Sequence, residues 1–183
     1  GIEVENPVFT SGGQQSQAIA PGEIDIASVL GGTSAILAAA NGVPLKVVAA
    51  YARSPKAYFL MTRADGPAKL ADLKGKKIAA LKGTVLNQLL VAALASQNLK
   101  LSDVEYIIMD LPAARAALLA GQVDVATLAG ANVTQVEKAG GRALTSGEGL
   151  IKPTTVIGAN AAFLEKHPDL VAAYFAAHHK ALD

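Results

Sequence analysis

The sequence predicts an α/β protein of two similar lobes, each a mostly parallel sheet with flanking helices, the first lobe being incomplete. Short apolar segments rich in β-branched residues alternate with helical patterns, which is typical of parallel strands covered on both faces. A segment of eight residues also recurs in the second half of the chain. Strand–helix alternation together with an internal repeat favours two units of the same kind over one continuous sheet.

Five segments have the short apolar composition that is expected of buried strands. They are Ile24–Ala27, Val47–Ala50, Ile78–Leu81, Val104–Met109 and Val123–Leu128. Two further strands, Tyr58–Thr62 and Thr154–Gly158, are expected to carry the chain between the lobes and to act as the hinge.

Helices are expected between these strands. Thr33 or Ser34 can cap the first helix at its N-terminus, and proline and glycine mark the ends of others. The predicted helices are Thr33–Asn41, Thr84–Gln97, Pro112–Ala120, the short Ala161–Lys166 after the cap Asn160, and a last helix from Pro168 onward.

The repeat defines the expected lobes. The residues GEIDIASV around Asp25 return as GQVDVATL around Asp124, 99 positions later, and Val4-Glu5 returns as Val104-Glu105. We therefore assign residues 1–62 and 151–183 to lobe 1 and residues 70–150 to lobe 2. In the second copy Val104 follows a strand and a helix that have no counterpart in the first copy. The repeat thus predicts a further strand–helix unit upstream, and more chain is also expected after the last helix.

The composition of the chain argues against several kinds of partner and active site. The formal net charge is +1, which is too balanced for a nucleic-acid partner, and no cysteine is present to form disulfides, thiolate metal sites or a nucleophile. The three histidines all lie near the C-terminus, away from the glycine-rich loops. Because no nucleophile–base pair, metal-ligand spacing or close carboxylate pair is evident, we expect no catalysis and no cofactor.

Several motifs in order resemble the solute-binding proteins of sulfonate/taurine/nitrate ABC importers. They are DLKGKKIA from Asp72, KGT from Lys82, the two Gly-x-[Ile/Val]-Asp repeats and FLEKHPDL from Phe163. The resemblance implies a type II periplasmic-binding-protein fold, a ligand in the cleft and a membrane permease as partner. It also implies a periplasmic or extracellular location, with membrane association through the permease or a lipid anchor. We expect a monomer that binds a small, anionic molecule.

One stretch departs from this family. Many sulfonate-binding relatives carry a tryptophan and a proline after the second repeated strand, where this chain reads AGANV from Ala129. The chain has no tryptophan, so the class of ligand is left open by the resemblance.

Two loops are expected to hold the ligand, because ligands of open α/β sheets bind beyond the carboxyl ends of the strands. The first loop contains Gly32, Thr33 and Ser34, and the second contains Gly83, Thr84 and Val85. Each opens a helix whose free N–H groups and dipole attract anions. The alternative for either loop is ordinary helix capping.

Five other residues are also candidates for ligand contact. Lys82 and Arg53 could supply positive charge, or they could be solvated or paired at the surface. Asn132 lies where relatives present contact residues, although it could be a turn residue. Ser11 and Gly12 could line the cleft wall or form a flexible turn.

A second function remains open. The effector-sensing domain of a LysR-type transcription regulator has a similar two-lobed architecture and would carry its DNA-binding helix-turn-helix upstream of this segment. The native N-terminus distinguishes the two, because a carrier begins with a signal peptide and a regulator with a winged helix.

Overall fold

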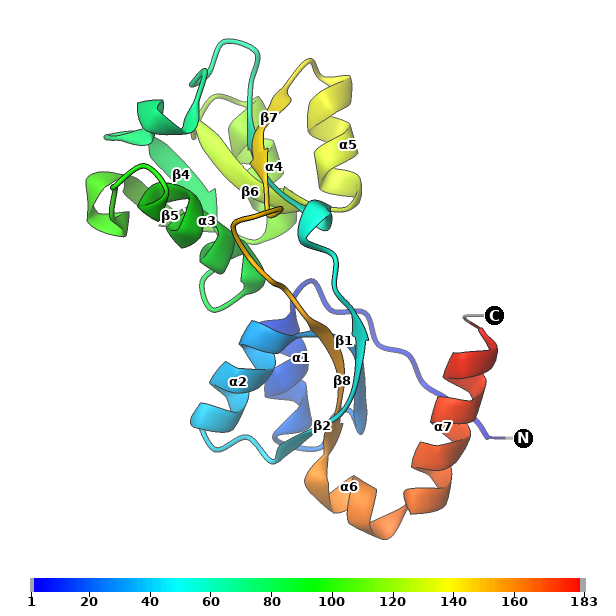
Figure 1. Ribbon diagram of the computed structural model, residues 1–183. Helices are drawn as coiled ribbons and strands as arrows, with labels where there is room; N and C mark the ends of the chain where they lie inside the picture. Colours follow the sequence, from blue (N-terminus) through cyan, green and yellow to red (C-terminus); the bar gives the residue numbers. More distant parts are fainter. Residues whose placement is uncertain (1, 182–183) are drawn as a thin grey trace.

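The chain forms two sheets in two lobes, which are joined by two extended crossing segments (Figure 1). A computed structural model describes residues 2–181. We call the part built on the three-stranded sheet lobe 1 and the part built on the five-stranded sheet lobe 2. The crossing segments are residues 53–57 and 147–154. Among the residues described, no helix combines the length and apolar character that spanning a bilayer would require.

Lobe 1 has the strand order β1-β8-β2, and both pairings are antiparallel. Its core joins Ile19, Leu30 and Val156, and helices α1 and α2 lie on one side of the sheet (Figure 1). Its elements are α1 (Gly12–Ile19), β1 (Ile26–Gly31), α2 (Gly32–Ala40), β2 (Leu45–Ala52), β8 (Thr155–Asn160), α6 (Ala161–Lys166) and α7 (Pro168–Lys180).

Lobe 2 has the order β5-β4-β6-β3-β7, with parallel pairing of β4 to β5 and β6 and antiparallel pairing of β3 to β6 and β7. Its strands are β3 (Tyr58–Thr62), β4 (Lys77–Ala80), β5 (Glu105–Ile108), β6 (Val125–Ala129) and β7 (Arg142–Ser146). Its helices are α3 (Val85–Ala95), α4 (Leu111–Leu119) and α5 (Ala131–Lys138), and short 3-10 turns are η1 (Pro55–Ala57), η2 (Leu70–Leu73) and η3 (Leu101–Asp103).

Successive strand residues of lobe 2 enter separate cores, because side chains alternate between the faces of a strand. Leu60 and Ile78 pack with α3 on one face, whereas Met61 and Ala79 pack with α4 and α5 on the other. The nearly continuous apolar composition of these strands follows from this burial on both faces.

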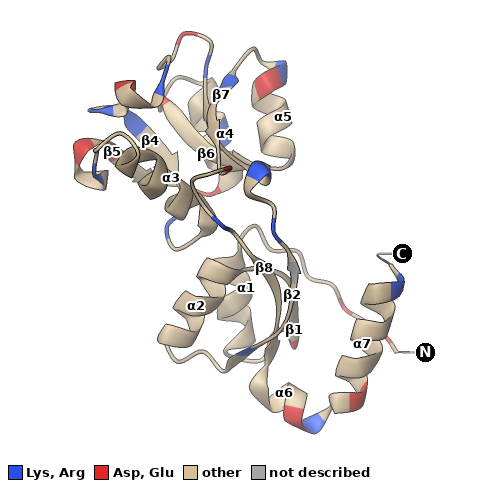
Figure 2. Cartoon of the chain, viewed as in Figure 1, with Lys and Arg blue, Asp and Glu red and all other residues tan. Residues whose placement is uncertain are grey.

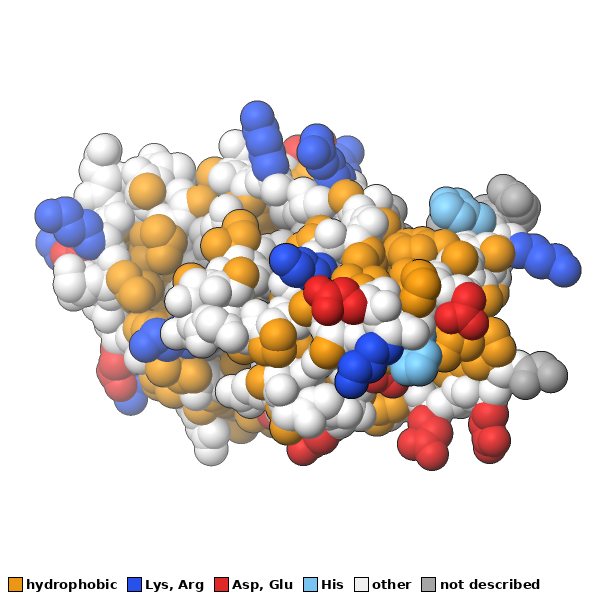
Figure 3. All heavy atoms as spheres, turned by 90° about the horizontal axis from the view of Figure 1, so that it is seen from below, with side chains coloured by type: hydrophobic (Ala, Val, Ile, Leu, Met, Phe, Trp, Pro, Cys, Tyr) orange, Lys and Arg blue, Asp and Glu red, His pale blue; other side chains and the backbone are white. Residues whose placement is uncertain are grey.

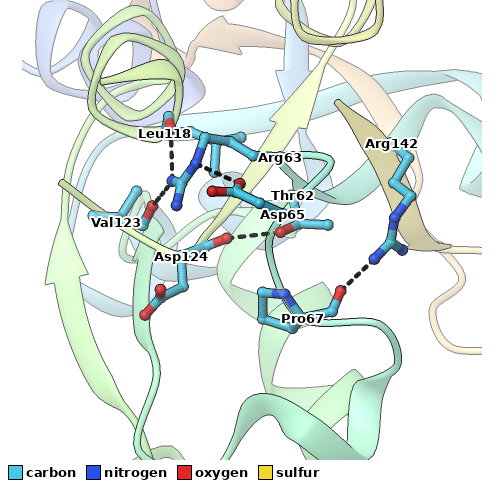
Figure 4. A network of polar contacts seen from close by, with 8 residues as sticks. All are labelled: Thr62, Arg63, Asp65, Pro67, Leu118, Val123, Asp124 and Arg142. Atoms are coloured by element: carbon cyan, nitrogen blue, oxygen red, sulfur yellow. Dashed lines mark hydrogen bonds and ion pairs between the residues drawn. The ribbon is translucent and has the colours of Figure 1, made fainter. Parts of the chain in front are cut away.

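The sequence repeat is also a structural repeat. In each lobe a strand of the repeat, β1 or β6, pairs with an antiparallel strand, β8 or β3, that pairs in turn with β2 or β7. Asn160 Nδ2 donates to Ile19 O (3.1 Å) at the end of α1, and Arg63 Nη1 donates to Leu118 O (3.0 Å) at the end of α4 (Figure 4). The two carbonyls are 99 positions apart, as are Asp25 and Asp124.

The sheets differ from the prediction in strand direction. Lobe 1 was expected to be mostly parallel, but each of its pairings is antiparallel, and lobe 2 is mixed. The reason is that β8 returns from lobe 2 and inserts between β1 and β2. The segment Val4–Phe9, which begins with the Val4-Glu5 that the repeat matches to Val104-Glu105, has no ladder partner in the structure. Its counterpart β5 pairs with β4, and lobe 1 has no described counterpart of β4.

The boundary between the lobes also differs from the predicted one. Tyr58–Thr62 pairs along its whole length with β6, so it belongs to lobe 2 and not to a lobe 1 that ends at residue 62. The chain crosses before it, at η1, and crosses back in residues 147–154, before β8. That each lobe folds as a separate unit remains a prediction.

Candidate ligand-binding site

Five helices begin where the two lobes face each other. Helices α1 and α2 start there from lobe 1, and α3, α4 and α5 start there from lobe 2. This follows from the order of elements, because each of α2, α3, α4 and α5 directly follows the carboxyl end of a strand. The N–H groups of a first helical turn have no partner within the helix, so several such donors converge on this region.

A cavity of about 150 Å³ lies among these helix starts. Lobe 1 contributes Thr10, Ser11, Gly12, Val29, Gly31, Ser34 and Thr155. Lobe 2 contributes Tyr58, Leu81, Thr84, Val85, Leu86, Leu111 and Ala129. A cavity of similar size in another protein holds benzene, so this one suits a small organic molecule.

The lining combines hydroxyl groups with apolar side chains. None of the residues that line the cavity carries a formal charge. Figure 2 shows charged residues mainly on outer loops, helix ends and the crossing segments. A ligand here would therefore meet hydroxyls and backbone donors first, with any full positive charge lying beyond the lining.

Side chains also meet across the cleft, next to the cavity. Thr33 Oγ1 donates to Gln88 Oε1 of lobe 2 (3.2 Å), and Ser34 Oγ donates to Gly83 O (3.4 Å). Leu37 of α2 approaches Gly83 so closely that a Cβ there would lie 2.9 Å from its Cδ2. Gly83 also has φ +75°, a conformation that favours glycine, so this loop is shaped for close approach of the other lobe.

Five of the eleven predicted contact residues line the cavity. Ser11 and Gly12 are there as the cap and first residue of α1, and Ser34, Thr84 and Val85 are there at the starts of α2 and α3. That these residues contact a ligand remains a prediction.

The hydroxyl of Thr84 has a local role that limits what it can offer. It donates to Leu81 O (2.8 Å) and accepts from Leu86 N (3.3 Å), so its hydrogen points away from a ligand. The cap of α2 also differs from the prediction: it is Gly31 and not Thr33 or Ser34, because extended backbone at Gly31 starts the helix without a side-chain cap.

The remaining predicted residues lie outside the lining. Arg53 and Lys82 are exposed, on a crossing segment and in the loop before α3. Gly32 donates its N–H to Thr154 O (2.8 Å), and Thr33 and Gly83 take part in the contact across the cleft. Asn132 lies in the first turn of α5, three residues beyond the lining residue Ala129.

Sequence reasoning missed Arg115, which is half-buried on α4 and donates from Nη1 to Asn132 Oδ1 (3.1 Å). The two residues are 17 positions apart and in different helices. The only signal in the sequence was the four-residue spacing from Leu111, which places both side chains on one helix face.

The described residues offer little for other chemistry. Within residues 2–181 no group of three or more His, Asp or Glu side chains is placed to hold a metal ion. The histidines His167, His178 and His179 are not among the residues that line the cavity. Burial raises the pKa of the Tyr106 hydroxyl above its ordinary value, so this group on β5 stays neutral at physiological pH.

Comparisons with known proteins give a consistent picture. A family model described as NMT1/THI5 like matches residues 1–183. The taurine-binding periplasmic protein of Escherichia coli K12 is 30% identical over 178 residues, which are 95% of this chain and 55% of that protein.

Solved structures agree with this match. The alkanesulfonate-binding protein of Xanthomonas axonopodis pv. citri, bound to MOPS, is 28% identical, with a TM-score of 0.83 over 92% of this chain and 58% of its own. The periplasmic aliphatic sulphonate binding protein of Escherichia coli is 29% identical, with a TM-score of 0.77 over 91% of this chain and 54% of its own. The chain thus spans little more than half the length of these relatives.

A distant likeness shows how widely the fold is used. A desulfurization enzyme is 14% identical, with a TM-score of 0.54 over 70% of this chain. At this level of identity the likeness concerns the fold alone, and the chemistry has to be argued from the site.

Proposed function

Because the chain belongs to the NMT1/THI5-like family, we propose that it is part of the solute-binding component of an ABC importer. In this proposal the protein binds a small organic anion, such as an aliphatic sulfonate or a taurine-like compound, in the cavity between the lobes. It delivers the ligand to a membrane permease and acts in the periplasm or outside the cell. The relatives that bind taurine or sulfonates are binding proteins, and they support this assignment.

The observation that carries the proposal is the convergence of helix starts on a cavity lined by hydroxyls. A hydrogen bond to a charged group contributes about 1.5–3 kcal/mol, and a helix N-terminus up to about 2 kcal/mol in a partly buried site. Three or four such contacts, less the cost of immobilising the ligand, reach about −8 kcal/mol, which corresponds to about micromolar affinity. An anion can therefore be held here without a charged residue in the lining.

The size of the cavity supports a short ligand. A volume of about 150 Å³ accommodates a molecule near the size of benzene, which suits a sulfonate with a short hydrocarbon chain. Val29 of lobe 1 provides apolar surface for that chain. A ring-bearing ligand as large as MOPS would require the lobes to stand further apart.

The mechanism that we propose is reversible binding with closure of the lobes. A ligand that contacts α1 from lobe 1 and α3 from lobe 2 favours the arrangement in which both reach it. The contacts of Thr33 with Gln88 and of Ser34 with Gly83 form only when the lobes are close, so they add to the stability of the closed form. The crossing segments 53–57 and 147–154 are the places where the backbone would bend.

Removing the contact between Thr33 and Gln88 is expected to weaken ligand binding modestly. An exposed neutral hydrogen bond contributes about 0.5–1 kcal/mol, so Gln88→Leu or Thr33→Val should raise the dissociation constant about two- to fivefold. The double variant should be no weaker than either single variant, because both remove the same bond. Calorimetric titration of the four proteins measures this, and fully additive losses would show that the two residues act independently.

The experiment that tests the proposed function is calorimetric titration of the complete protein with a matched panel. The panel contains ethanesulfonate, taurine, nitrate, and ethanesulfonamide as a neutral analogue of similar shape. We expect about micromolar affinity for a sulfonate and at least tenfold weaker binding of the sulfonamide. Preference for a neutral apolar compound would contradict the anion site. Specific binding of duplex DNA would support the effector-sensing domain of a regulator instead.

A further inference from the structure

We propose that Arg115 is the residue that selects for negative charge at this site, with Asn132 holding its guanidinium in place. The inference rests on the proposed function and deepens it, because it says where the charged end of the ligand lies. The sulfonate group is placed toward α4 and α5 of lobe 2, and the hydrocarbon chain toward lobe 1.

The position of Arg115 on its helix directs it to the cleft. It lies four residues after Leu111, which lines the cavity at the first position of α4, so the two side chains share one face of the helix. Side chains of a helix tilt toward its N-terminus, and the N-terminus of α4 is its cleft end. A long arginine side chain is therefore carried toward the cavity and not away from it.

The contact with Asn132 confirms that direction. Arg115 Nη1 donates to Asn132 Oδ1 over 3.1 Å, in a partly buried setting. Asn132 lies in the first turn of α5, three residues after the lining residue Ala129. Both partners thus stand about one helical turn beyond residues that line the cavity, at the same edge of the lobe 2 sheet.

The charge of Arg115 is not neutralised. Within the described part of the chain no carboxylate oxygen lies within 4.0 Å of its guanidinium, and Nη1 donates to the neutral amide of Asn132. The nearest acid in sequence on this helix, Asp110, uses Oδ1 to accept from Ala113 N (2.9 Å) as the helix cap. A half-buried guanidinium with unused donors gains from an anion that can accept them in a fork-like geometry.

The internal repeat shows that the two lobes differ at the position of Arg115. Its counterpart 99 positions earlier is Ser16, whose Oγ donates to Gly12 O (2.9 Å) within α1. The counterpart of Asn132 is Thr33, which reaches across the cleft to Gln88. Lobe 1 therefore offers hydroxyls and apolar surface where lobe 2 offers a fixed positive charge, and this asymmetry sets the orientation of the ligand.

The test uses the complete protein and two ligands of similar shape, ethanesulfonate and the neutral ethanesulfonamide. Arg115→Gln should weaken ethanesulfonate about ten- to hundredfold and change sulfonamide affinity less than about twofold, because only the anion loses a charged partner. Arg115→Lys should give an intermediate loss, since it keeps the charge without the fork. Arg142→Gln is the matched control, because Arg142 bonds to Pro67 O (2.7 Å) of another loop and should leave both affinities unchanged (Figure 4).

A second variant separates binding from folding. Asn132→Asp places a carboxylate beside Arg115, so it should preserve or raise the melting temperature while weakening ethanesulfonate about tenfold or more. Equal losses for both ligands in Arg115→Gln, or unchanged ethanesulfonate affinity in either variant, would overturn the role of Arg115 while the proposed function stands. If the unaltered protein bound neither sulfonate nor any other anion, that result would contradict the proposed function itself, whatever the role of Arg115.

Discussion

Replacing Ala129 by phenylalanine is expected to weaken binding of the small anion by about ten- to hundredfold, the equivalent of about 1–3 kcal/mol of overpacking. Ala129 ends β6, pairs with Tyr58 on β3, and lines the cavity with it. A benzyl group at this position takes up much of a space of about 150 Å³. The ligand must then compete with a side chain that is always present.

The matched control for this variant is Ala143→Phe. Ala143 is exposed on β7, an edge strand of the same sheet, so it tests the general effect of an added aromatic ring. Titration calorimetry gives both affinities, and thermal unfolding shows that both variants fold. Unaltered affinity in Ala129→Phe, with the fold intact, would place the ligand outside this cavity.

Replacing Arg63 by methionine is expected to destabilise lobe 2 by about 2–4 kcal/mol, because two buried carbonyl groups lose a charged donor. Arg63 Nη1 donates to Leu118 O (3.0 Å) and Val123 O (2.8 Å), closing the turn between α4 and β6 (Figure 4). Urea unfolding of the complete protein measures the loss, and hydrogen exchange at the amides of α4 should locate it in lobe 2.

The control for Arg63 is Asp65→Ala. Arg63 Nε also contacts Asp65 Oδ1 (3.1 Å), but the Asp65 side chain is 77% exposed, so losing this pair should cost less than about 1 kcal/mol. If the two variants were equally destabilised, the surface ion pair and not the carbonyl contacts would account for the effect of Arg63.

The elements that were predicted correctly are those whose structure depends on residues close together in the sequence. Tyr58–Thr62 and Ala161–Lys166 have the predicted bounds, and Asn160 caps the second of them by accepting from Ala162 N (2.9 Å). The predicted helix Thr84–Gln97 corresponds to α3, whose buried face includes Leu89 and Leu90. These features depend on side-chain periodicity and capping within a few residues.

Helix α5 and strand β7 escaped prediction because their signals are weak. Helix α5 buries only Val133 and Val136 against the sheet, and strand β7 is a half-buried edge strand with polar residues. The direction of the sheets was also out of reach, because a strand's composition does not say which strand will pair with it. Only the return of the chain through β8 makes lobe 1 antiparallel.

Only part of the site was predicted, because some of its features are local and others depend on residues far apart in the sequence. The helix start at Gly83 and Thr84 is a local feature and was predicted, whereas Ser11 and Gly12, expected in the cleft wall or in a flexible turn, begin helix α1. The partners of Thr33 and Arg115 lie 55 and 17 positions away, so only the folded chain brings them together. One apolar feature of lobe 1 was also invisible in the sequence: Ile36 and Val47 are 74% and 55% exposed on a lobe whose surface carries many apolar side chains (Figure 3).

Binding of a small anion between the helix starts of both lobes can be observed directly in a crystal structure of the complete protein grown with ethanesulfonate. We expect the sulfonate group in the cavity, within hydrogen-bond distance of first-turn N–H groups and with its negative charge toward Arg115. The ethyl group should lie on the side of Val29. Electron density for the ligand on the outer surface, or in contact with one lobe alone, would show that the anion does not bind between the helix starts of both lobes.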